Sequence, residues 1–349
     1  MSRGPNVTVA GAGALGLSAA LALADAGCTV TVCDPARGSQ ASAVAAGMLA
    51  PVFEAVLDPA AASDLELLLA ARNLWPGLAE RTGITVDRSG AAAVGSDDWL
   101  AGIRAQLARY GLRGTELPRT MLENLVPGLA SNLEGLLVRE DWRLEPRAAL
   151  QALRHAAEGV GVTFRSEAVC ERGQADWLVV ATGAGQELAN VAPELSELSP
   201  IKGQILRFMD RRGGRISLRA EGAYAVPGSD GLAIGATMEP GRNDTTIDPV
   251  TFQPLAETAG RLFPELAEAT FGVSVGVRAA TPDGLPMVGL SQTPKVVLAV
   301  GARRNGWLLA PLAAWIVTAC VMGSDSGPYA PRLAPSRFKG TGVETGRAR

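Results

Sequence analysis

The chain has 349 residues, of which 47% are hydrophobic and 19% charged, and its formal net charge is −3. This length exceeds that of a single compact core, so we expect two domains or one large α/β domain with an inserted lobe. The acidic and basic residues are interspersed along the chain. This pattern supplies no basic stripe for phosphates and argues against nucleic-acid binding.

The cysteine and histidine content limits the chemistry that side chains alone can perform. The cysteines have no metal-ligand spacing, so we expect buried, reduced thiols and no metal site; they are Cys28, Cys33, Cys170 and Cys320. The single histidine, His155, is remote in sequence from every glycine motif, which excludes Ser-His-Asp and Cys-His catalysis. The chemistry is therefore expected to come from a cofactor.

Two segments bear on the location of the protein. Residues 1–6 are too few and too polar for a secretory signal, so a cytoplasmic location is expected. Residues 306–323 are apolar enough to be compared with a membrane span, but Pro311 interrupts them, and we expect no membrane contact. The apolar content would suit a homo-oligomer, although composition alone does not establish one.

Hydrophobic periodicity predicts alternating strands and helices. Strands are expected at residues 7–10, 28–33, 162–165, 177–181, 273–277 and 296–300, and helices at residues 14–26, 63–83, 99–111 and 146–158 and in the final apolar segment. Residues 84–94 read as a strand and a turn. Short strands with glycine and proline turns predict an antiparallel sheet at residues 201–238. The tail after residue 323 is expected to be loose.

This order of elements predicts an α/β fold, with a Rossmann-type nucleotide-binding domain and a second α+β substrate domain built on an antiparallel sheet. We assign residues 1–80, 141–198 and 275–349 to the nucleotide-binding domain. Residues 81–140 and 199–274 are assigned to the substrate-binding domain.

A glycine motif lies between the first predicted strand and helix. Gly11, Gly13 and Gly16 fit G-x-G-x-x-G, and Asp34 follows Gly16 by eighteen residues at the end of the next strand. The glycines allow the backbone and a helix N-terminus to approach a pyrophosphate, while the carboxylate accepts a hydrogen bond from a ribose hydroxyl. The motif predicts a dinucleotide but does not separate NAD from FAD. A small-residue turn at Gly183, after the strand at 177–181, favours the flavin.

Three further segments carry a family resemblance. SAVAAGMLAP at residues 42–51, GVRAATPDGLPMVG at 276–289 and GARRNGWLLAP at 301–311 resemble the D-amino-acid oxidase family of flavoproteins, and glycine oxidase within it. The resemblance runs from about residue 7 to residue 322. It implies FAD, held without a covalent bond. The residues that it places at FAD are Ala14, Leu15, Asp34, Ala41, Ser42, Ala46, Gly47, Met48, Val169, Ala302, Arg303, Arg304, Asn305, Gly306, Trp307 and Leu308.

The same resemblance implies the catalytic residues Arg278, Tyr224 and Arg304. Arg278 is expected to hold the substrate carboxylate with its planar fork, Tyr224 to donate a second hydrogen bond, and Arg304 to lie in the same pocket. Met48 and Met238 are expected to line the substrate site. The expected reaction is that an amino acid, bound with its amine neutral, loses a hydride from Cα to the flavin. The imino acid then hydrolyses to a keto acid and ammonia, and oxygen becomes hydrogen peroxide.

For glycine the products would be iminoacetate and then glyoxylate, and in the family this imine supplies the thiazole branch of thiamine biosynthesis. A D-amino-acid, amine or sarcosine oxidase, or a dehydrogenase with another electron acceptor, stays open, as does a protein that binds the dinucleotide without turnover. Three positions depart from the family pattern. Ala302 and Gly222 stand where histidine is frequent, and Gly228 where arginine is common. They predict a less polar pocket and a substrate that is larger or more apolar than glycine.

Overall fold

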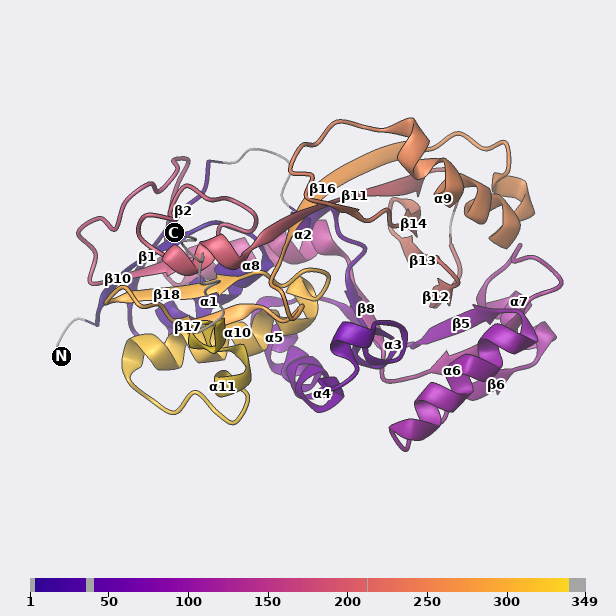
Figure 1. Ribbon diagram of the computed structural model, residues 1–349, viewed down its shortest axis with the longest axis horizontal. Coiled ribbons are helices and arrows are strands. Elements are labelled where there is room, and N and C mark those ends of the chain that lie inside the picture. Colours follow the sequence, from indigo (N-terminus) through magenta and orange to yellow (C-terminus); the bar gives the residue numbers. More distant parts are fainter. Residues whose placement is uncertain (1–3, 36–40, 212, 339–349) are drawn as a thin grey trace, which may run out of the picture.

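The computed structural model describes residues 4–35, 41–211 and 213–338, and its strands form two large sheets that lie side by side and one small sheet (Figure 1). The first sheet has the order β17-β18-β10-β1-β2-β9. Its strands are parallel except for β17, which runs antiparallel to β18. Their bounds are β1 Asn6–Ala10, β2 Thr29–Cys33, β9 Thr163–Arg165, β10 Trp177–Val180, β17 Met287–Leu290 and β18 Val296–Val300. The predicted Rossmann-type sheet is confirmed.

The second sheet is mainly antiparallel and has the order β15-β11-β14-β13-β12-β5-β7-β6, with β16 also paired to β11. The bounds are β5 Ala91–Gly95, β6 Thr115–Leu117, β7 Glu134–Val138, β11 Ser199–Phe208, β12 Ser217–Ala220, β13 Ala223–Gly228, β14 Gly231–Gly235, β15 Glu239–Pro240 and β16 Gly272–Ala280. A small sheet joins β3 Met48–Leu49, β4 Val86–Asp87 and β8 Trp142–Leu144. The antiparallel sheet expected at residues 201–238 is therefore present.

The predicted domain boundaries stay a prediction, although the strands largely follow them. Strand β16 crosses the boundary drawn at residue 275 and pairs with β11 from Gly272 to Ala280. The whole of β16 thus belongs to the second sheet. Strand β16 is followed in the chain by β17 and β18 of the first sheet. The end of β16 therefore connects the second sheet to the first.

Helices cover both sheets. Helices α1 (Ala14–Asp25) and α10 (Gly306–Met322) pack against each other in one hydrophobic core with α4 (Leu65–Asn73), α5 (Trp75–Thr82) and α8 (Pro146–Gly159). Helices α6 (Asp97–Arg109), α7 (Arg119–Leu125) and α9 (Pro249–Leu262) lie over the second sheet (Figure 1). Shorter elements are α2 Ala41–Val44, α3 Pro51–Leu57, α11 Ala330–Leu333 and 3-10 turns at Pro59–Ala61, Pro193–Glu197, Pro264–Leu266 and Pro335–Phe338.

The helix predicted at residues 63–83 is two helices. The break falls between α4 and α5 because Pro76 has no N–H for the helical ladder, and its ring clashes with the preceding turn. The buried Trp75 at the start of α5 donates its indole N–H to the carbonyl of Trp307, at 3.1 Å. The break therefore anchors this segment to the beginning of α10.

The prediction of a loose tail is wrong for residues 324–338. Leu333 on α11 is fully buried, and the Arg332 guanidinium pairs with Asp64 at 3.0 Å. Arg337 donates to both carboxylate oxygens of Asp283, at 2.9 and 3.0 Å. Residues 339–349 lie outside the described residues. A membrane-spanning helix would need a longer apolar run than any helix of the described residues supplies.

The expectation of buried thiols holds for Cys28 and Cys33 only. All the cysteines are free, but Cys170 is exposed and Cys320 is half-buried. Cys170 lies in the irregular segment between β9 and β10, where the chain runs over the surface.

Candidate active site

A cavity of about 1180 Å³ lies where the first sheet meets one face of the second. It brings together residues from across the sequence, and nearly all the predicted site residues line it. They are Gly11, Gly13, Ala14, Leu15, Asp34, Ala41, Ser42, Ala46, Gly47, Met48, Val169, Gly183, Tyr224, Met238, Arg278, Ala302, Arg303, Arg304, Asn305, Gly306 and Trp307. Two predicted residues, Gly16 and Leu308, are not part of its wall.

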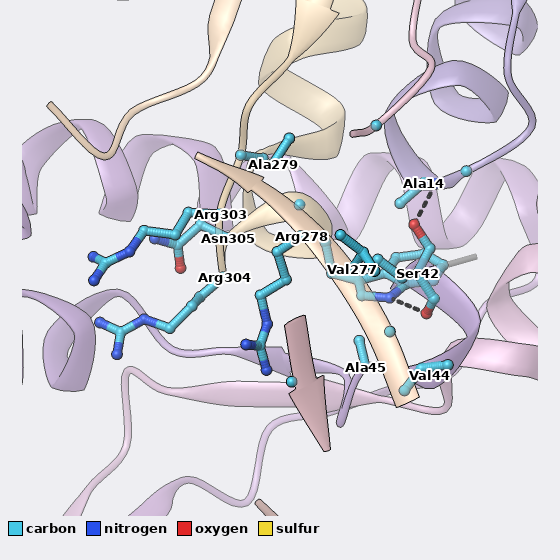
Figure 2. A pocket seen from close by; sticks show the side chains of 18 of the residues that line it. Ala14, Ser42, Val44, Ala45, Val277, Arg278, Ala279, Arg303, Arg304 and Asn305 are labelled. Atoms are coloured by element: carbon cyan, nitrogen blue, oxygen red, sulfur yellow. Dashed lines mark hydrogen bonds between the residues drawn. The ribbon is translucent and has the colours of Figure 1, made fainter. Parts of the chain in front are cut away.

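The glycine motif forms one end of this cavity. Gly11 has a φ of +109°, and a Cβ there would lie 2.4 Å from the carbonyl oxygen of Ala181. A Cβ on Gly16 would lie 2.0 Å from the carbonyl oxygen of Gly11, so Gly16 allows α1 to pack closely on the turn without reaching the cavity. The Ala14 N–H donates to Ser42 Oγ at 3.0 Å (Figure 2). These contacts place the N-terminus of α1 at the cavity wall, as an anion site requires.

Asp34 lies at the carboxyl end of β2, where the motif predicts it. Its Oδ2 accepts the Ala12 N–H at 2.7 Å, which holds the carboxylate beside the glycine turn. Val169, which is half-buried, and Gly183, with a φ of +64°, line the same end from the segments around β10. Two parallel strands of the first sheet thus deliver their terminal turns to one crevice, which is the usual position of a dinucleotide.

A second turn lines the cavity before α10. Gly301 has a φ of +80° and Arg303 a φ of +50°, and the Arg303 N–H donates to the carbonyl of Ala279 at 2.8 Å. Gly306 and Trp307, the first residues of α10, line the cavity, and the helix dipole gives this end a partial positive charge. Trp307 donates its indole N–H to the carbonyl of Ser42 at 3.0 Å. Leu308 is fully buried behind this turn.

Arg278 and Tyr224 lie on one face of the second sheet because of its register. Tyr224 is paired with Gly235, and Gly235 with Ile205 of β11. Ile201, four residues before Ile205 on the same face of β11, is paired with Arg278, so the side chains of Tyr224 and Arg278 point the same way. Two glycines make room for the large groups. A Cβ on Gly235 would lie 2.3 Å from the Tyr224 hydroxyl oxygen, and one on Gly203 would lie 2.4 Å from Arg278 Nη1.

Arg278 makes only weak contacts within the protein. Its Nη1 lies 3.4 Å from the carbonyl oxygen of Thr237 and 3.4 Å from the sulfur of Met238. Among the described residues, no carboxylate forms an ion pair with it. Burial lowers the pKa of the guanidinium, and the positive Arg304 and Arg303 add to that effect, yet arginine stays charged at neutral pH.

The neighbouring phenol is held neutral. Burial raises the pKa of Tyr224, which outweighs the opposing effect of the positive Arg278 and Arg219. At neutral pH its hydroxyl is therefore a hydrogen-bond donor. A charged fork and a neutral donor on one face of a sheet match the two oxygens of a carboxylate.

Arg304 lies differently from the prediction. Its Nη2 is 2.9 Å from Glu54 Oε2 and also contacts Asp58, and Arg303 pairs with Asp58 as well. In Figure 2 the side chains of Arg303 and Arg304 point to one side, away from the direction of Arg278. The predicted third substrate residue thus lines the cavity while its charge is held by α3.

Three residues of this cluster are absent from the sequence predictions: Glu54, Asp58 and Arg219. No motif spacing identifies the two acids. The sequence could have indicated Arg219, because a hairpin with Glu221 and Gly222 in its turn places residue 219 opposite residue 224. The structure shows this pairing of Arg219 with Tyr224.

The family described as FAD dependent oxidoreductase matches residues 6–320. The chain belongs to this family. FAD is therefore its cofactor, and the close approach of the Gly11 backbone to Ala181, with Gly11 and Gly13 in the cavity wall, fits a dinucleotide at this end of the cavity.

Curated relatives from two groups are similar over most of the chain. A bifunctional protein ThiO/ThiG of Trichormus variabilis is 31% identical over 96% of this chain and 55% of the relative. The chain spans about half the length of such bifunctional relatives. A glycine oxidase of Pseudomonas aeruginosa is 30% identical over 93% of this chain and 98% of the relative.

Solved structures share the fold. A glycine oxidase from Geobacillus kaustophilus superposes with a TM-score of 0.81 at 24% identity, over 97% of this chain and all of that one. An iminodiacetate oxidase from Chelativorans sp. BNC1 has a TM-score of 0.82 at 23% identity, over 95% of this chain and 98% of that one.

Proposed function

We propose that this protein uses FAD to oxidise glycine or another small amino acid at its Cα–N bond. The substrate loses two electrons and two protons to give the imino acid, which water hydrolyses to the keto acid and ammonia. For glycine these products are iminoacetate and glyoxylate. Molecular oxygen accepts the two electrons and two protons and becomes hydrogen peroxide. FAD, when bound, supplies the redox chemistry by accepting the hydride that leaves Cα.

The observation that carries the proposal is the pair Arg278 and Tyr224 on one cavity wall, with the dinucleotide motif at the other end of the same cavity. Arg278 would hold the substrate carboxylate bidentately, and Tyr224 would donate a hydrogen bond to it. Both side chains lie against glycines of the sheet, which would hold them in place to orient the substrate. The proposed reaction requires no protein base.

The cofactor would lie between the two turns that line the cavity. The first turn, with Gly11, Gly13 and Asp34, would hold the ADP part. The turn from Ala302 to Trp307 would surround the flavin ring, with the N-terminus of α10 favouring negative charge there. Similarity to proteins named ThiO/ThiG and glycine oxidase supports glycine as a substrate and a place in the thiazole branch of thiamine biosynthesis.

The test is an absorbance spectrum of the purified protein, followed by anaerobic addition of glycine, sarcosine and D-alanine in turn. Glycine is expected to bleach the flavin bands, and admitting air should restore them with release of peroxide. A bound flavin that no amine or amino acid bleaches would refute the oxidase and leave a dinucleotide-binding role. Sarcosine or D-alanine bleaching far faster than glycine would select one of the related oxidases.

The Arg278→Ala variant tests the assigned role of that residue. Loss of a bidentate, charge-assisted contact is expected to raise the KM for glycine roughly 100-fold while FAD stays bound. Arg104→Ala is the matched control, because Arg104 lies on the surface of α6 and pairs with Glu116 of β6. Unchanged kinetics of Arg278→Ala would remove Arg278 from the substrate site.

A further inference from the structure

A fully buried lysine lies behind the wall of the cavity that carries Arg278. Lys202 and Gln204 of β11 flank Gly203, and neighbouring residues of a strand point to opposite faces of a sheet. Gly203 lines the cavity beside Arg278, so Lys202 and Gln204 face the other side. Both are fully buried, and a lysine is almost never fully buried unless it is paired. Lys202 therefore needs partners within the protein.

The partners of Lys202 come from the segment between β15 and α9. Its Nζ lies 2.9 Å from Asp244 Oδ1 and 3.6 Å from Glu239 Oε2. Gln204 adds two contacts: its Nε2 donates to Glu239 Oε1 at 3.0 Å, and its Oε1 accepts the Asp248 N–H at 2.9 Å. Two side chains of β11 therefore hold the beginning, the middle and the end of this segment.

The middle of the segment borders the cavity. Residues 242–247, which we call the rim segment, have no regular secondary structure. Asn243 and Thr245 are exposed residues that line the cavity, whereas Asp244 between them turns to Lys202. Within the described residues, this contact is the only hydrogen bond or ion pair that joins the rim segment to an element other than β15. Lys202 therefore holds this part of the cavity edge against the sheet.

The same network fixes the two protein groups that Arg278 contacts. Thr237 Oγ1 accepts the Gln204 N–H at 2.9 Å and donates to Glu239 Oε1 at 3.0 Å. The Thr237 carbonyl oxygen and the Met238 sulfur each lie 3.4 Å from Arg278 Nη1. The rim segment and the surroundings of Arg278 therefore depend on one set of hydrogen bonds behind the sheet.

We propose that Lys202 is a positioning residue for substrate binding, because its contact with Asp244 holds the rim segment closed over the substrate end of the cavity. This inference rests on the proposed function, in which Arg278 binds the substrate carboxylate. A closed rim excludes water, and a charge pair is stronger where water is excluded. When the rim is free to open, only the closed fraction of the protein binds the substrate tightly, so the apparent affinity falls by that fraction.

The test removes the partner of Lys202 and leaves the buried lysine in place. Lys202→Met would leave the buried Glu239 without its cation, which can unfold a protein, whereas the Asp244 side chain is 37% exposed. The substrate is whichever of glycine, sarcosine and D-alanine reduces the flavin fastest. In FAD-bound Asp244→Ala its KM is expected to rise roughly tenfold with kcat little changed, because a charge-assisted hydrogen bond is lost. Asp244→Asn keeps an oxygen acceptor for Lys202, and a smaller rise is expected.

Arg242→Ala is the matched control for the kinetics. Arg242 Nε pairs with the other oxygen of Asp244, Oδ2, at 2.7 Å, and this pair is exposed. Exposed ion pairs contribute little, and the contact of Asp244 with Lys202 is kept. The KM is therefore expected to stay unchanged in this variant.

Trypsin reports the position of the rim segment without catalysis. It cleaves after Arg242, and cleavage within a folded protein requires local opening. FAD-bound Asp244→Ala is expected to be cut between residues 242 and 243 at least about tenfold faster than the wild type, as identified by mass spectrometry. Thr246→Ala is the control, because it keeps the backbone N–H that Asp244 accepts at 3.0 Å.

Any of three results would overturn the inference. An unchanged cleavage rate in Asp244→Ala would show that the contact with Lys202 does not hold the segment. Faster cleavage with an unchanged KM would show that the segment does not act on the substrate, and it leaves the proposed function standing. An equal rise of KM in Arg242→Ala would assign the effect to the surface pair. If no amino acid reduces the flavin of the wild type, the proposed function fails and the inference fails with it.

Discussion

Gly203 of β11 controls where the Arg278 guanidinium lies, and Gly203→Ala is expected to displace it. A Cβ at this position would lie 2.4 Å from Nη1, 2.6 Å from Nη2 and 2.7 Å from Cζ of Arg278. Ordinary contact begins at 3.4 Å, so the guanidinium must move by about 1 Å. A displacement of this size can cost about 100-fold in substrate use when the group orients the substrate.

The fold should tolerate this change. The obstacle is the far end of a flexible side chain, and Gly203 is not among the residues with a positive φ. Alanine also restricts the unfolded chain, which stabilises a protein by about 0.4–1 kcal/mol where the backbone is compatible. We therefore expect an unchanged or slightly higher Tm, full FAD content, and a KM for the preferred amino acid raised roughly 100-fold.

Steady-state kinetics, flavin absorbance and thermal unfolding measure the three quantities separately. Gly272→Ala is the matched control, because Gly272 pairs with the same strand β11 and a Cβ there meets no atom within 4 Å. A KM that is unchanged in FAD-bound Gly203→Ala would refute the reasoning. A KM that rises equally in Gly272→Ala would show that the effect does not come from Arg278.

Two further predictions concern stability. Burial raises the pKa of Asp141 to about 7 in the folded protein, above its usual value of about 4 in the unfolded chain. Between these two pH values only the folded protein keeps the proton, so the free energy of unfolding should fall as the pH rises from about 4 to about 7, by at most about 1.4 kcal/mol per pH unit. Denaturant unfolding across these pH values checks it, and an equally steep decline in Asp141→Asn would contradict it. Arg337→Leu should destabilise the protein by about 1–3 kcal/mol, because it leaves Asp283 with fewer donors in the ordered tail. Unchanged thermal and denaturant unfolding would show that the tail contributes nothing.

Sequence reasoning succeeded where the interactions are local in the chain. The glycine motif, the first strand and helix, and Asp34 lie within about thirty residues, and each has a steric or hydrogen-bonding reason that spacing reveals. The family resemblance extended this to Arg278 and Tyr224. The structure places them on one sheet face through the pairing of Tyr224 with Gly235 and of Ile201 with Arg278.

The missed features depend on contacts between distant residues. The tail reads as loose because it is rich in proline, serine and glycine, but Arg332 and Arg337 meet Asp64 and Asp283 across more than forty residues. Helix α9 was absent from the expected elements because it contains Pro254 and buries only Leu255, Ala259 and Leu262, which is a weak apolar stripe. Such elements are selected by packing, which spacing does not reveal.

The position of α3 explains why Arg304 is paired with protein carboxylates while Arg278 is not, among the described residues. Asp141 is fully buried and accepts the N–H groups of Val52 and Phe53, at 2.8 and 3.0 Å, which fixes the start of this short helix. The helix then directs Glu54 at Arg304, while Asp58, at its C-cap, contacts Arg304 as well. Two of the three arginines of the C-terminal motifs, Arg303 and Arg304, are thereby held by protein carboxylates, and Arg278 keeps its donors. Under the proposed function, a buried acid outside the cavity would thus help to decide which positive charge inside it is left for a substrate carboxylate.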